Sequence, residues 1–529
     1  MIKRSLLATA IAAMSVQATN AAPFLPMDAR GLAMGNTGVA SAQRAHAPAY
    51  NPSLLSQGSD DDDFALLFPQ VGVDIADEEE LIDEAEKISD DIFPAFEDAI
   101  EGAAGVSEGL DANLDTLTAR IDQLETALGT GDANQIATAN SNLKDALTTV
   151  DSDLVLTQSA ISDLTGSLGK ISGSPLSARL GVASALAIPS KKFAAAISLQ
   201  GSANVSARIN FASRDLNLLD SYVPAAQGYV NATEDVTDEI DSATADNNVD
   251  AQESSDLQDA VDALGEYSYE ADDGTLIFSD GELTDEARNA DLTSTAEFVA
   301  VAVVDLGISF SREFMIADEA VAIGITPKLQ KIMTYHYADE VDGFDDVDED
   351  DLEDSKEEYS HFNMDIGASW RFGADKTWMV GLVAKNIMGG EFDYADAVVT
   401  PKDEDGNPTG EPSYILEGGK VSLDPQFRAG VAYSGEWVSA AFDIDLVEND
   451  PVAYESATQF ASLGAEFDLF DTLQLRAGYR TNLSASGSDI VSVGFGLSPF
   501  GVHIDIAGMA NIDDPESEAG VALETGFYF

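Results

Sequence analysis

Cysteine is absent from this chain of 529 residues. Its absence excludes disulfide bonds and any metal site built on thiolates. Basic residues are also scarce, because 26 Lys and Arg stand against 95 Asp and Glu, a formal net charge of −69. Nucleic-acid binding needs a cationic surface that neutralises phosphates, so we expect no nucleic-acid partner.

Long hydrophobic runs are missing too. A transmembrane helix needs about 20 apolar residues, and the apolar stretch 6–16 is shorter. This stretch follows the basic pair Lys3 and Arg4, which is the pattern of a secretory signal peptide. Three small residues offer cleavage sites: Ala18, Ala21 and Ala22. We take residues 1–21 as the signal peptide and expect an exported protein without a membrane-spanning helix.

Catalytic motifs are few. The four histidines are scattered, and none falls in a metal-binding spacing: His46, His336, His361 and His503. Residues 105–109 match the hydrolase string G-x-S-x-G, but that motif needs a strand-to-helix turn and here lies between predicted helices. Glycine motifs for phosphate or dinucleotide binding are also lacking. We therefore predict that the chain is not an enzyme and needs no cofactor and no metal.

The sequence instead shows side chains of two kinds that alternate along the chain with a period of two residues, most clearly in residues 518–529. One face of this stretch carries Ala519, Val521, Leu523, Thr525, Phe527 and Phe529, and the other carries Gly520, Ala522, Glu524, Gly526 and Tyr528. One apolar face and one small or polar face are typical of strands in outer-membrane barrels. The aromatic end, with Phe527 and Phe529, is similar to the signal read by the bacterial barrel-assembly machinery, which implies contact with that machinery during biogenesis.

The same period recurs in about fourteen segments. The first lies at residues 61–75, and the others lie between residues 173 and 529. Long connections alternate with short ones such as 189–191, 373–376 and 434–436, as in a barrel with long outer loops and short periplasmic turns. We predict an all-β transmembrane barrel of about 14 antiparallel strands, surrounded by the lipid of a Gram-negative outer membrane. Its last strand closes on its first, and both termini are periplasmic.

Residues 76–172, between the first two strands, have a helical period. Apolar residues recur there in steps of four and three: Leu110, Leu114, Leu117, Ile121, Leu124 and Leu128. This is the seam of a coiled coil, and a second seam begins at Ile136 after a glycine-containing break. We predict a helical hairpin, which is either an arm that binds a partner protein or a spacer on the barrel rim.

The other long connections are acidic. Residues 212–295 and 338–358 are rich in Asp and Glu, and residues 403–407 resemble part of a calcium loop. Calcium takes oxygen ligands, but the rest of the calcium-loop spacing is missing. We therefore predict solvated acidic loops.

Alternation also predicts the charged side chains that face the lumen. These are His361, Asp365, Arg371, Lys385, Arg428, Asp443, Asp445, Arg476, Arg480, Asp505 and Glu524. Because both signs of charge face one enclosed space, we expect them to form ion pairs. A hydrolytic site that uses Asp443 and His361 is a less favoured alternative.

Residues 31–40, GLAMGNTGVA, are followed by Tyr50-Asn51-Pro52. This segment resembles the amino-terminal region of FadL/TodX outer-membrane channels, and most closely their TraF-like subfamily associated with conjugal transfer. The resemblance implies that residues 22–60 form a hatch inside the barrel and that small hydrophobic molecules diffuse in without a cofactor. It places the ligand near Met34, Asn36, Tyr50, Asn51 and Pro52. The competing hypothesis is an interaction protein for cell contact or conjugation that acts through the helical insertion.

Overall fold

The structure is a computed structural model. It describes residues 24–58, 63–77, 79–102, 108–246, 248–288, 290, 292–316, 319–341, 349–373, 375–400, 414–470, 472–485 and 488–528. The chain divides into two compact units. One unit comprises Met1–Glu79, Pro175–Arg208 and Ala296–Phe529, and the other comprises Glu80–Ser174 and Ile209–Thr295. The predicted signal peptide and the stretch 403–407 lie outside the described residues.

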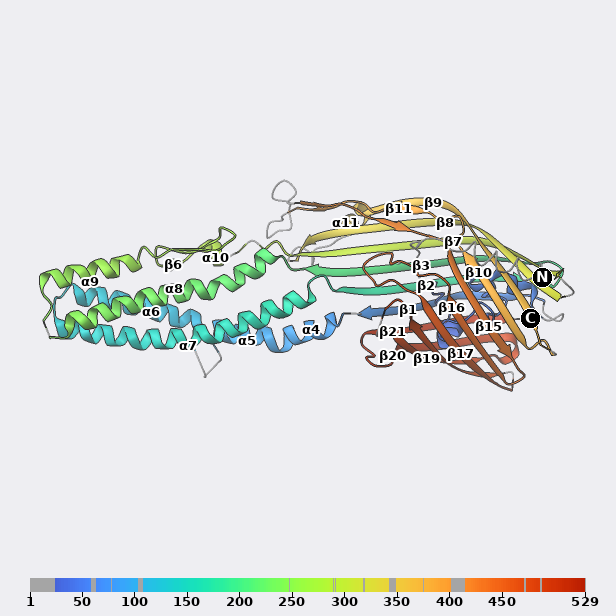
Figure 1. The fold of residues 1–529 in the computed structure, drawn as a ribbon, viewed down its shortest axis with the longest axis horizontal. Coiled ribbons are helices and arrows are strands. Elements are labelled where there is room, and N and C mark those ends of the chain that lie inside the picture. The colour runs from blue at the N-terminus through green and yellow to red at the C-terminus, as the bar shows by residue number, and fades with distance from the viewer. Residues whose placement is uncertain are drawn as a thin grey trace, which may run out of the picture. The chain divides into compact units, whose positions relative to one another are not determined.

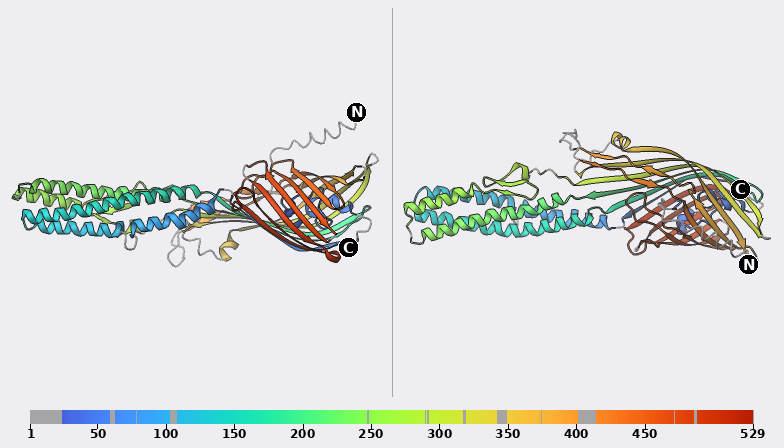
Figure 2. Two further views of the ribbon diagram at one scale, coloured as in Figure 1. Left: turned by 90° about the horizontal axis from the view of Figure 1, so that it is seen from below. Right: turned by 45° about the horizontal axis from the view of Figure 1, so that its top comes forward.

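Fourteen described strands form a closed antiparallel barrel in the first unit (Figures 1 and 2). They are β1 (Ala65–Asp77), β2 (Pro175–Ile188), β3 (Ala194–Asn210), β7 (Thr295–Ile316), β8 (Glu319–Glu340), β9 (Lys356–Phe372), β10 (Trp378–Lys385), β15 (Gln426–Ser434), β16 (Val438–Asp445), β17 (Phe460–Leu469), β18 (Leu473–Asn482), β19 (Asp489–Leu497), β20 (Val502–Asn511) and β21 (Glu518–Tyr528). The ring closes where β21 pairs with β1, with Val521 opposite Val73. The predicted barrel of about 14 strands is confirmed.

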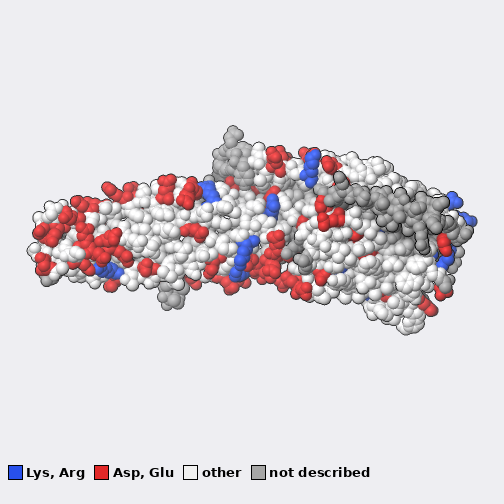
Figure 3. Space-filling model, in the orientation of Figure 1, with Lys and Arg blue, Asp and Glu red and all other residues white. Residues whose placement is uncertain are grey.

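The wall has an apolar outer face and a polar inner face. On β21, the exposed fractions of the outward-facing Val521 and Leu523 are 58% and 54%. Glu524, which faces inward, is 2% exposed. Strand β1 alternates in the same way, since Ile75 is exposed and Asp74 is buried. Figure 3 shows uncharged surface over much of the barrel face in view. This arrangement is that of a barrel that spans a membrane.

Aromatic side chains gather at the short turns. A row of ring contacts runs across β9, β10 and β15. The centroids of successive rings are 5.3, 6.2 and 5.2 Å apart along the row Trp370, Phe372, Trp378 and Tyr433. The turns after β17 and β19 present the exposed rings of Phe470 and Phe500. Aromatic belts mark the boundary between lipid and water in membrane barrels. The short turns therefore lie at a membrane surface.

The long connections contain short elements of their own. The connection between β8 and β9 includes α11 (Glu349–Asp354). Between β10 and β15, β11 (Glu391–Asp393) pairs with β14 (Lys420–Ser422), and β12 (Ala397–Val399) pairs with β13 (Tyr414–Leu416). The connection between β1 and β2 and the connection between β3 and β7 build the second unit.

The second unit is mainly helical. Its helices are α4 (Leu81–Lys87), the π-helix η2 (Ile88–Ile92), α5 (Phe93–Ile100), α6 (Gly109–Leu128), α7 (Ala133–Ile171), α8 (Ser213–Thr244), α9 (Ala251–Leu264) and α10 (Asp285–Arg288), and it also holds a small sheet of β4 (Tyr269–Glu270), β5 (Leu276–Ser279) and β6 (Glu282–Leu283). Many Asp and Glu side chains lie on its visible surface (Figure 3). Among the described helices, none is both long and apolar enough to cross a membrane.

The helical insertion predicted between the first two strands is confirmed, but it is only half of this unit. Residues 212–295 were predicted as a solvated acidic loop. The structure instead places α8 and α9 there, packed with α6 and α7 around one core. Apolar residues of α8 recur at steps of seven and four: Leu218, Ala225, Tyr229, Val236 and Ile240. The many acidic residues between them, and Pro224 within the helix, obscured this seam.

Truncation of the core residue Leu143 should destabilise the helical unit. Leu143 on α7 is fully buried, whereas Leu156 on the same helix is 60% exposed. Leu143→Ala is expected to lower the free energy of unfolding by about 2–5 kcal/mol, because it leaves a cavity. Leu156→Ala, the matched control, should change it by about 0.5 kcal/mol or less. Denaturant unfolding of the full chain, followed by helical circular dichroism, measures both, and equal shifts would contradict the packing described.

Candidate functional site

Residues 24–58 lie inside the barrel (Figures 1 and 2). This segment, which we call the hatch, contains α2 (Ala29–Ala33), α3 (Ala47–Tyr50) and the 3-10 helix η1 (Pro52–Ser56). Side chains cap two of these short helices. Asp28 Oδ1 accepts a hydrogen bond from the Gly31 amide at 2.7 Å, and Asn51 Oδ1 accepts one from the Ser53 amide at 3.1 Å. These caps hold the segment in a defined shape without a long helix.

Glycines of the wall provide the space for the hatch. A Cβ atom added to Gly478 would lie 2.0 Å from the backbone nitrogen of Gly35. A Cβ atom on Gly381 would lie 2.3 Å from the carbonyl oxygen of Val39. Close approaches of the same kind occur at Gly72, Gly181, Gly324, Gly367 and Gly464. Any side chain at these positions would collide with the hatch, so the inner surface of the barrel is shaped to this segment.

Polar groups of the wall bind the hatch backbone and side chains. Asp443 on β16 accepts hydrogen bonds from the amides of Gly38 and Val39, at 2.7 and 2.9 Å. Arg480 on β18 donates to the side-chain oxygen of Asn36 at 2.9 Å. These bonds are charge-assisted and lie in a buried environment, where such bonds are strongest. They hold the turn that follows α2 against the wall.

Three further cations predicted to face the lumen also contact the hatch. Arg371 and Lys385 donate hydrogen bonds to hatch carbonyl groups at 2.7 and 3.0 Å. The guanidinium of Arg428 lies 4.4 Å from the ring centre of Phe24. The contacts are hydrogen bonds, ion pairs and packing, all of which can break and re-form without a chemical step.

The other predicted lumen residues mainly pair within the wall. Asp445 pairs with Arg428, Asp505 with Arg476, and Asp365 with Lys328. Arg476 also binds Glu466 at 2.6 Å, and Glu466 in turn binds Arg30 of the hatch at 3.1 Å. His361 Nε2 lies 2.6 Å from the carbonyl oxygen of Gly389. Asp443 and His361, considered above for hydrolysis, therefore each have a partner of their own.

The hatch residues predicted to bind a ligand are buried between hatch and wall. These are Met34, Asn36, Tyr50, Asn51 and Pro52. Two pockets flank the hatch, and none of the five lines either one. A pocket of about 120 Å³ lies beside Phe24 and Met27, with Lys328 and Lys385 on its wall side. A pocket of about 240 Å³ lies beside residues 40–44, His503 and Tyr528. A role of the five residues in ligand binding stays a prediction.

The carboxyl-terminal aromatic residues were predicted as an assembly signal. Phe527 packs edge-on against Phe68 of β1, with ring centroids 5.3 Å apart. Phe527 therefore helps to seal the junction between the first and last strands. Phe529 lies outside the described residues.

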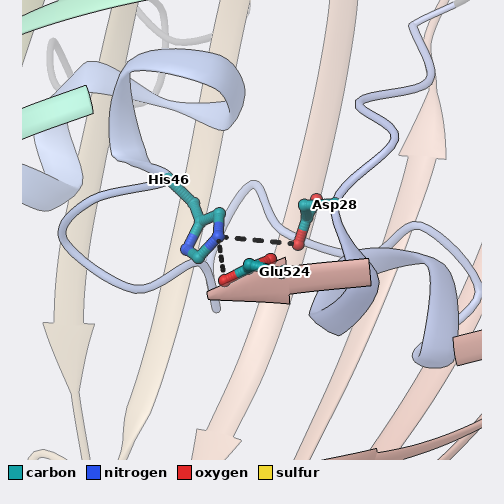
Figure 4. Close-up of side chains that lie close together, drawn as sticks. All are labelled: Asp28, His46 and Glu524. Carbon is teal, nitrogen blue, oxygen red and sulfur yellow. Dashed lines mark ion pairs between the residues drawn. The ribbon is translucent and has the colours of Figure 1, made fainter. Parts of the chain in front are cut away.

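The sequence interpretation missed a buried cluster between hatch and wall (Figure 4). His46 Nε2 lies 2.8 Å from Oε1 of Glu524 on β21 and 4.0 Å from Oδ1 of Asp28. The second oxygen of Asp28 accepts a hydrogen bond from the Tyr50 hydroxyl at 2.5 Å. Only Glu524 was predicted to face the lumen. Asp28 and His46 are 18 positions apart and Glu524 is at the other end of the chain, so no local spacing signals the cluster.

The charge of His46 depends on its acidic neighbours. Burial disfavours the imidazolium, but the ion pair with Glu524 outweighs burial and raises the pKa of His46 from 6.5 to about 9. The contact with Glu524 has the distance of an ion pair but not the geometry of a hydrogen bond, and both His46 Nε2 and Glu524 Oε2 lack a hydrogen-bond partner. Two buried carboxylates thus share one imidazole.

Comparisons with known proteins identify a family for the chain. The family described as "F plasmid transfer operon, TraF, protein" matches residues 48–445. No curated protein matches the sequence. Solved structures similar to this one include the toluene transporter TbuX of Ralstonia pickettii and TodX of P. putida. Each has 9% identity, a TM-score of 0.43, and coverage of 96% of this chain and 99% of the other.

A FadL homologue of Pseudomonas aeruginosa is also similar, with 10% identity, a TM-score of 0.42, and coverage of 97% of this chain and 99% of that one. The resemblance to TraF-like proteins read from residues 31–52 agrees with the family match. The family match covers well over half of the sequence. The chain therefore belongs to the TraF protein family of the F plasmid transfer operon.

Proposed function

We propose that this protein is an outer-membrane channel through which small hydrophobic molecules diffuse when the hatch moves. The observation that carries the proposal is the hatch itself. A segment of the same chain occupies the interior of a closed barrel, and the wall is adapted to it by glycines and by polar anchors such as Asp443. A barrel with only a structural role has no need for such a fitted, non-covalent plug.

Permeation would begin at the pocket beside Phe24 and Met27. The first residues of the hatch form one side of this pocket, and Val303 of β7 and Leu423 of the connection between β14 and β15 contribute to the rest. Displacement of the hatch from this side would connect the pocket with the remaining lumen. No nucleotide or redox group enters this scheme, because diffusion down a gradient needs none.

Uptake of a small apolar probe tests the proposal. Purified protein is reconstituted in lipid vesicles, and the entry of radiolabelled toluene into an apolar trap inside the vesicles is followed. We expect initial uptake to exceed that of protein-free vesicles and to rise linearly with toluene concentration, as diffusion requires. Uptake equal to that of vesicles holding an unrelated barrel of the same size would overturn the proposal.

A second candidate function is protein–protein contact through the helical unit. Val155 and Leu156, adjacent on α7, are 66% and 60% exposed and leave two aliphatic side chains in contact with solvent on an acidic surface. Deletion of residues 78–172 alone would leave α8 and α9 without their core. The informative variant therefore lacks both 80–174 and 209–295, with short turns in their place. Lost cell contact or conjugation with unchanged permeation would favour this second function.

A further inference from the structure

We infer that Asp28, His46 and Glu524 form a binding site for a divalent transition-metal ion such as Zn²⁺, which fastens the hatch to the closing strand. Each residue offers one ligand atom, and these atoms all lie within 4.8 Å of one another. All three side chains are buried, with exposed fractions of 2%, 3% and 2%. Figure 4 shows the imidazole and both carboxylates turned toward a common point.

The spacing of the ligand atoms suits a small cation. Bonds of about 2.1 Å from Zn²⁺ to nitrogen or oxygen place tetrahedral ligand atoms roughly 3.4 Å apart. The observed separations from His46 Nε2 are 2.8 Å to Glu524 and 4.0 Å to Asp28, on either side of that value. Small rotations of the side chains would therefore complete the site. One imidazole and two carboxylates is a ligand set for borderline ions and not for Ca²⁺, which takes six or more oxygens.

Unpartnered polar atoms point to the same conclusion. Glu524 Oε2 is buried without a hydrogen-bond partner, and His46 Nε2 meets Glu524 Oε1 without the geometry of a hydrogen bond. A buried polar atom without a partner is unfavourable, so such atoms call for a ligand or another compensation. Coordination by a cation would satisfy both atoms. It would also balance the two carboxylates, since Arg30 close by is already bound to Glu466 and to the carbonyl oxygen of Ser41.

Neighbouring groups hold the ligands in place. The Tyr528 hydroxyl lies 3.3 Å from His46 Nδ1. A proton on Nδ1 shared with this hydroxyl leaves the lone pair of Nε2 for the metal, which is the usual arrangement of a metal-binding histidine. Tyr50 and the Gly31 amide hold the two oxygens of Asp28. The pocket of about 240 Å³ reaches Tyr528 and offers an entry route.

The other histidines do not offer such a site among the described residues. His336 has partners for both ring nitrogens, with Nδ1 2.9 Å from the Ala395 carbonyl and Nε2 2.9 Å from Glu297. His361 Nε2 is bound to Gly389. The ring of His503 packs edge-on against Tyr528, with centroids 4.5 Å apart. His503 is therefore a matched control, because it is a lumen histidine close to the cluster but outside it.

Cobalt binding tests the site without reference to transport. The full chain is purified in detergent, treated with a chelator, and titrated with Co²⁺ in excess Mg²⁺, which occupies the acidic surface. We expect one Co²⁺ to bind with visible absorption bands that report nitrogen and oxygen ligands. His46→Gln and Glu524→Gln should each weaken binding by at least about 10-fold, whereas His503→Gln should not. Circular dichroism and heat-dependent gel mobility establish that each variant is folded.

Two results would overturn the site: a wild-type protein that shows no such bands, or bands that persist unchanged in both His46→Gln and Glu524→Gln. If Glu524→Gln does not fold, Asp28→Asn takes its place in the comparison. That the ion keeps the hatch closed rests on the proposed function. Failure of toluene uptake with intact Co²⁺ binding would remove the channel but leave the metal site.

Discussion

Gly478→Ala is expected to displace the hatch. The added methyl group would lie 2.0 Å from the Gly35 nitrogen, 2.4 Å from the Met34 carbonyl carbon and 2.6 Å from Ser492 Oγ. Two of these atoms belong to the hatch backbone and cannot rotate away, so the hatch must move. Overpacking of this kind costs about 1–3 kcal/mol. If the strain falls on the closed state alone, the closed-to-open ratio changes by roughly 5- to 150-fold.

The effect of Gly478→Ala should appear as leakage. We expect cells that carry this variant to become more sensitive to large hydrophilic antibiotics, which a closed hatch excludes. Gly508→Ala is the control, because Gly508 lies on β20 of the same wall and a methyl group there would meet nothing closer than 3.9 Å. Equal sensitivity of the two variants, at equal amounts of folded barrel, would show that the wall glycines do not hold the hatch.

Arg428→Met is expected to cause the largest loss of barrel stability. Arg428 and Asp445 form a two-pronged ion pair with distances of 2.5 and 2.9 Å, and their side chains are 1% and 3% exposed. Removal of the cation leaves Asp445 charged and buried, which typically costs about 3–5 kcal/mol. The variant also lacks the contact between the Arg428 guanidinium and the ring of Phe24, so the hatch should be held less tightly as well.

An exposed pair of the same wall provides the comparison. Lys331 and Glu358 lie 2.7 Å apart on β8 and β9, and their side chains are 52% and 42% exposed. Lys331→Met should therefore cost at most about 1 kcal/mol. Guanidinium unfolding of the barrel in detergent micelles gives the free energy for both variants. A loss for Arg428→Met no larger than that for Lys331→Met would mean that the buried network contributes little.

The barrel was predictable because its pattern is local. The alternation at residues 518–529 and the contrast between long and short connections each repeat many times, and every repeat depends on neighbouring residues alone. The helical hairpin was equally readable from heptad steps such as Leu117 to Leu124 in the first helix and Ile136 to Leu143 in the second. Helix α8 was missed because acidic residues fill the positions between its core residues. The acidic composition indicated a loop, and the regular spacing of the apolar residues was overlooked.

The site was less predictable because it depends on contacts across the chain. Alternation placed Glu524, Asp443 and Arg480 on the inner face. It could not show which groups they bind, since those partners lie more than 400 positions away in the hatch. Gly478 and Gly381 read as small residues of a strand, and only the fold reveals the close approach of the hatch. His46 appeared as an isolated histidine for the same reason.

We expect that the hatch must leave the wall before molecules pass. Ser53 of the hatch and Ser369 of β9 have hydroxyl oxygens 2.9 Å apart, a separation that cysteine sulfurs can bridge. Ser177 and Ser206, both in the wall, lie 2.8 Å apart and provide a matched control. Because the chain has no cysteine of its own, each double substitution, Ser53→Cys with Ser369→Cys or Ser177→Cys with Ser206→Cys, gives a single defined disulfide.

Toluene uptake into vesicles, measured for both disulfide variants before and after reduction, shows whether the hatch has to move. We predict that the oxidised hatch–wall disulfide lowers uptake to that of protein-free vesicles, that reduction restores it, and that the wall–wall disulfide has no effect. Uptake at the wild-type rate through a barrel whose hatch is covalently fixed to β9 would contradict the account.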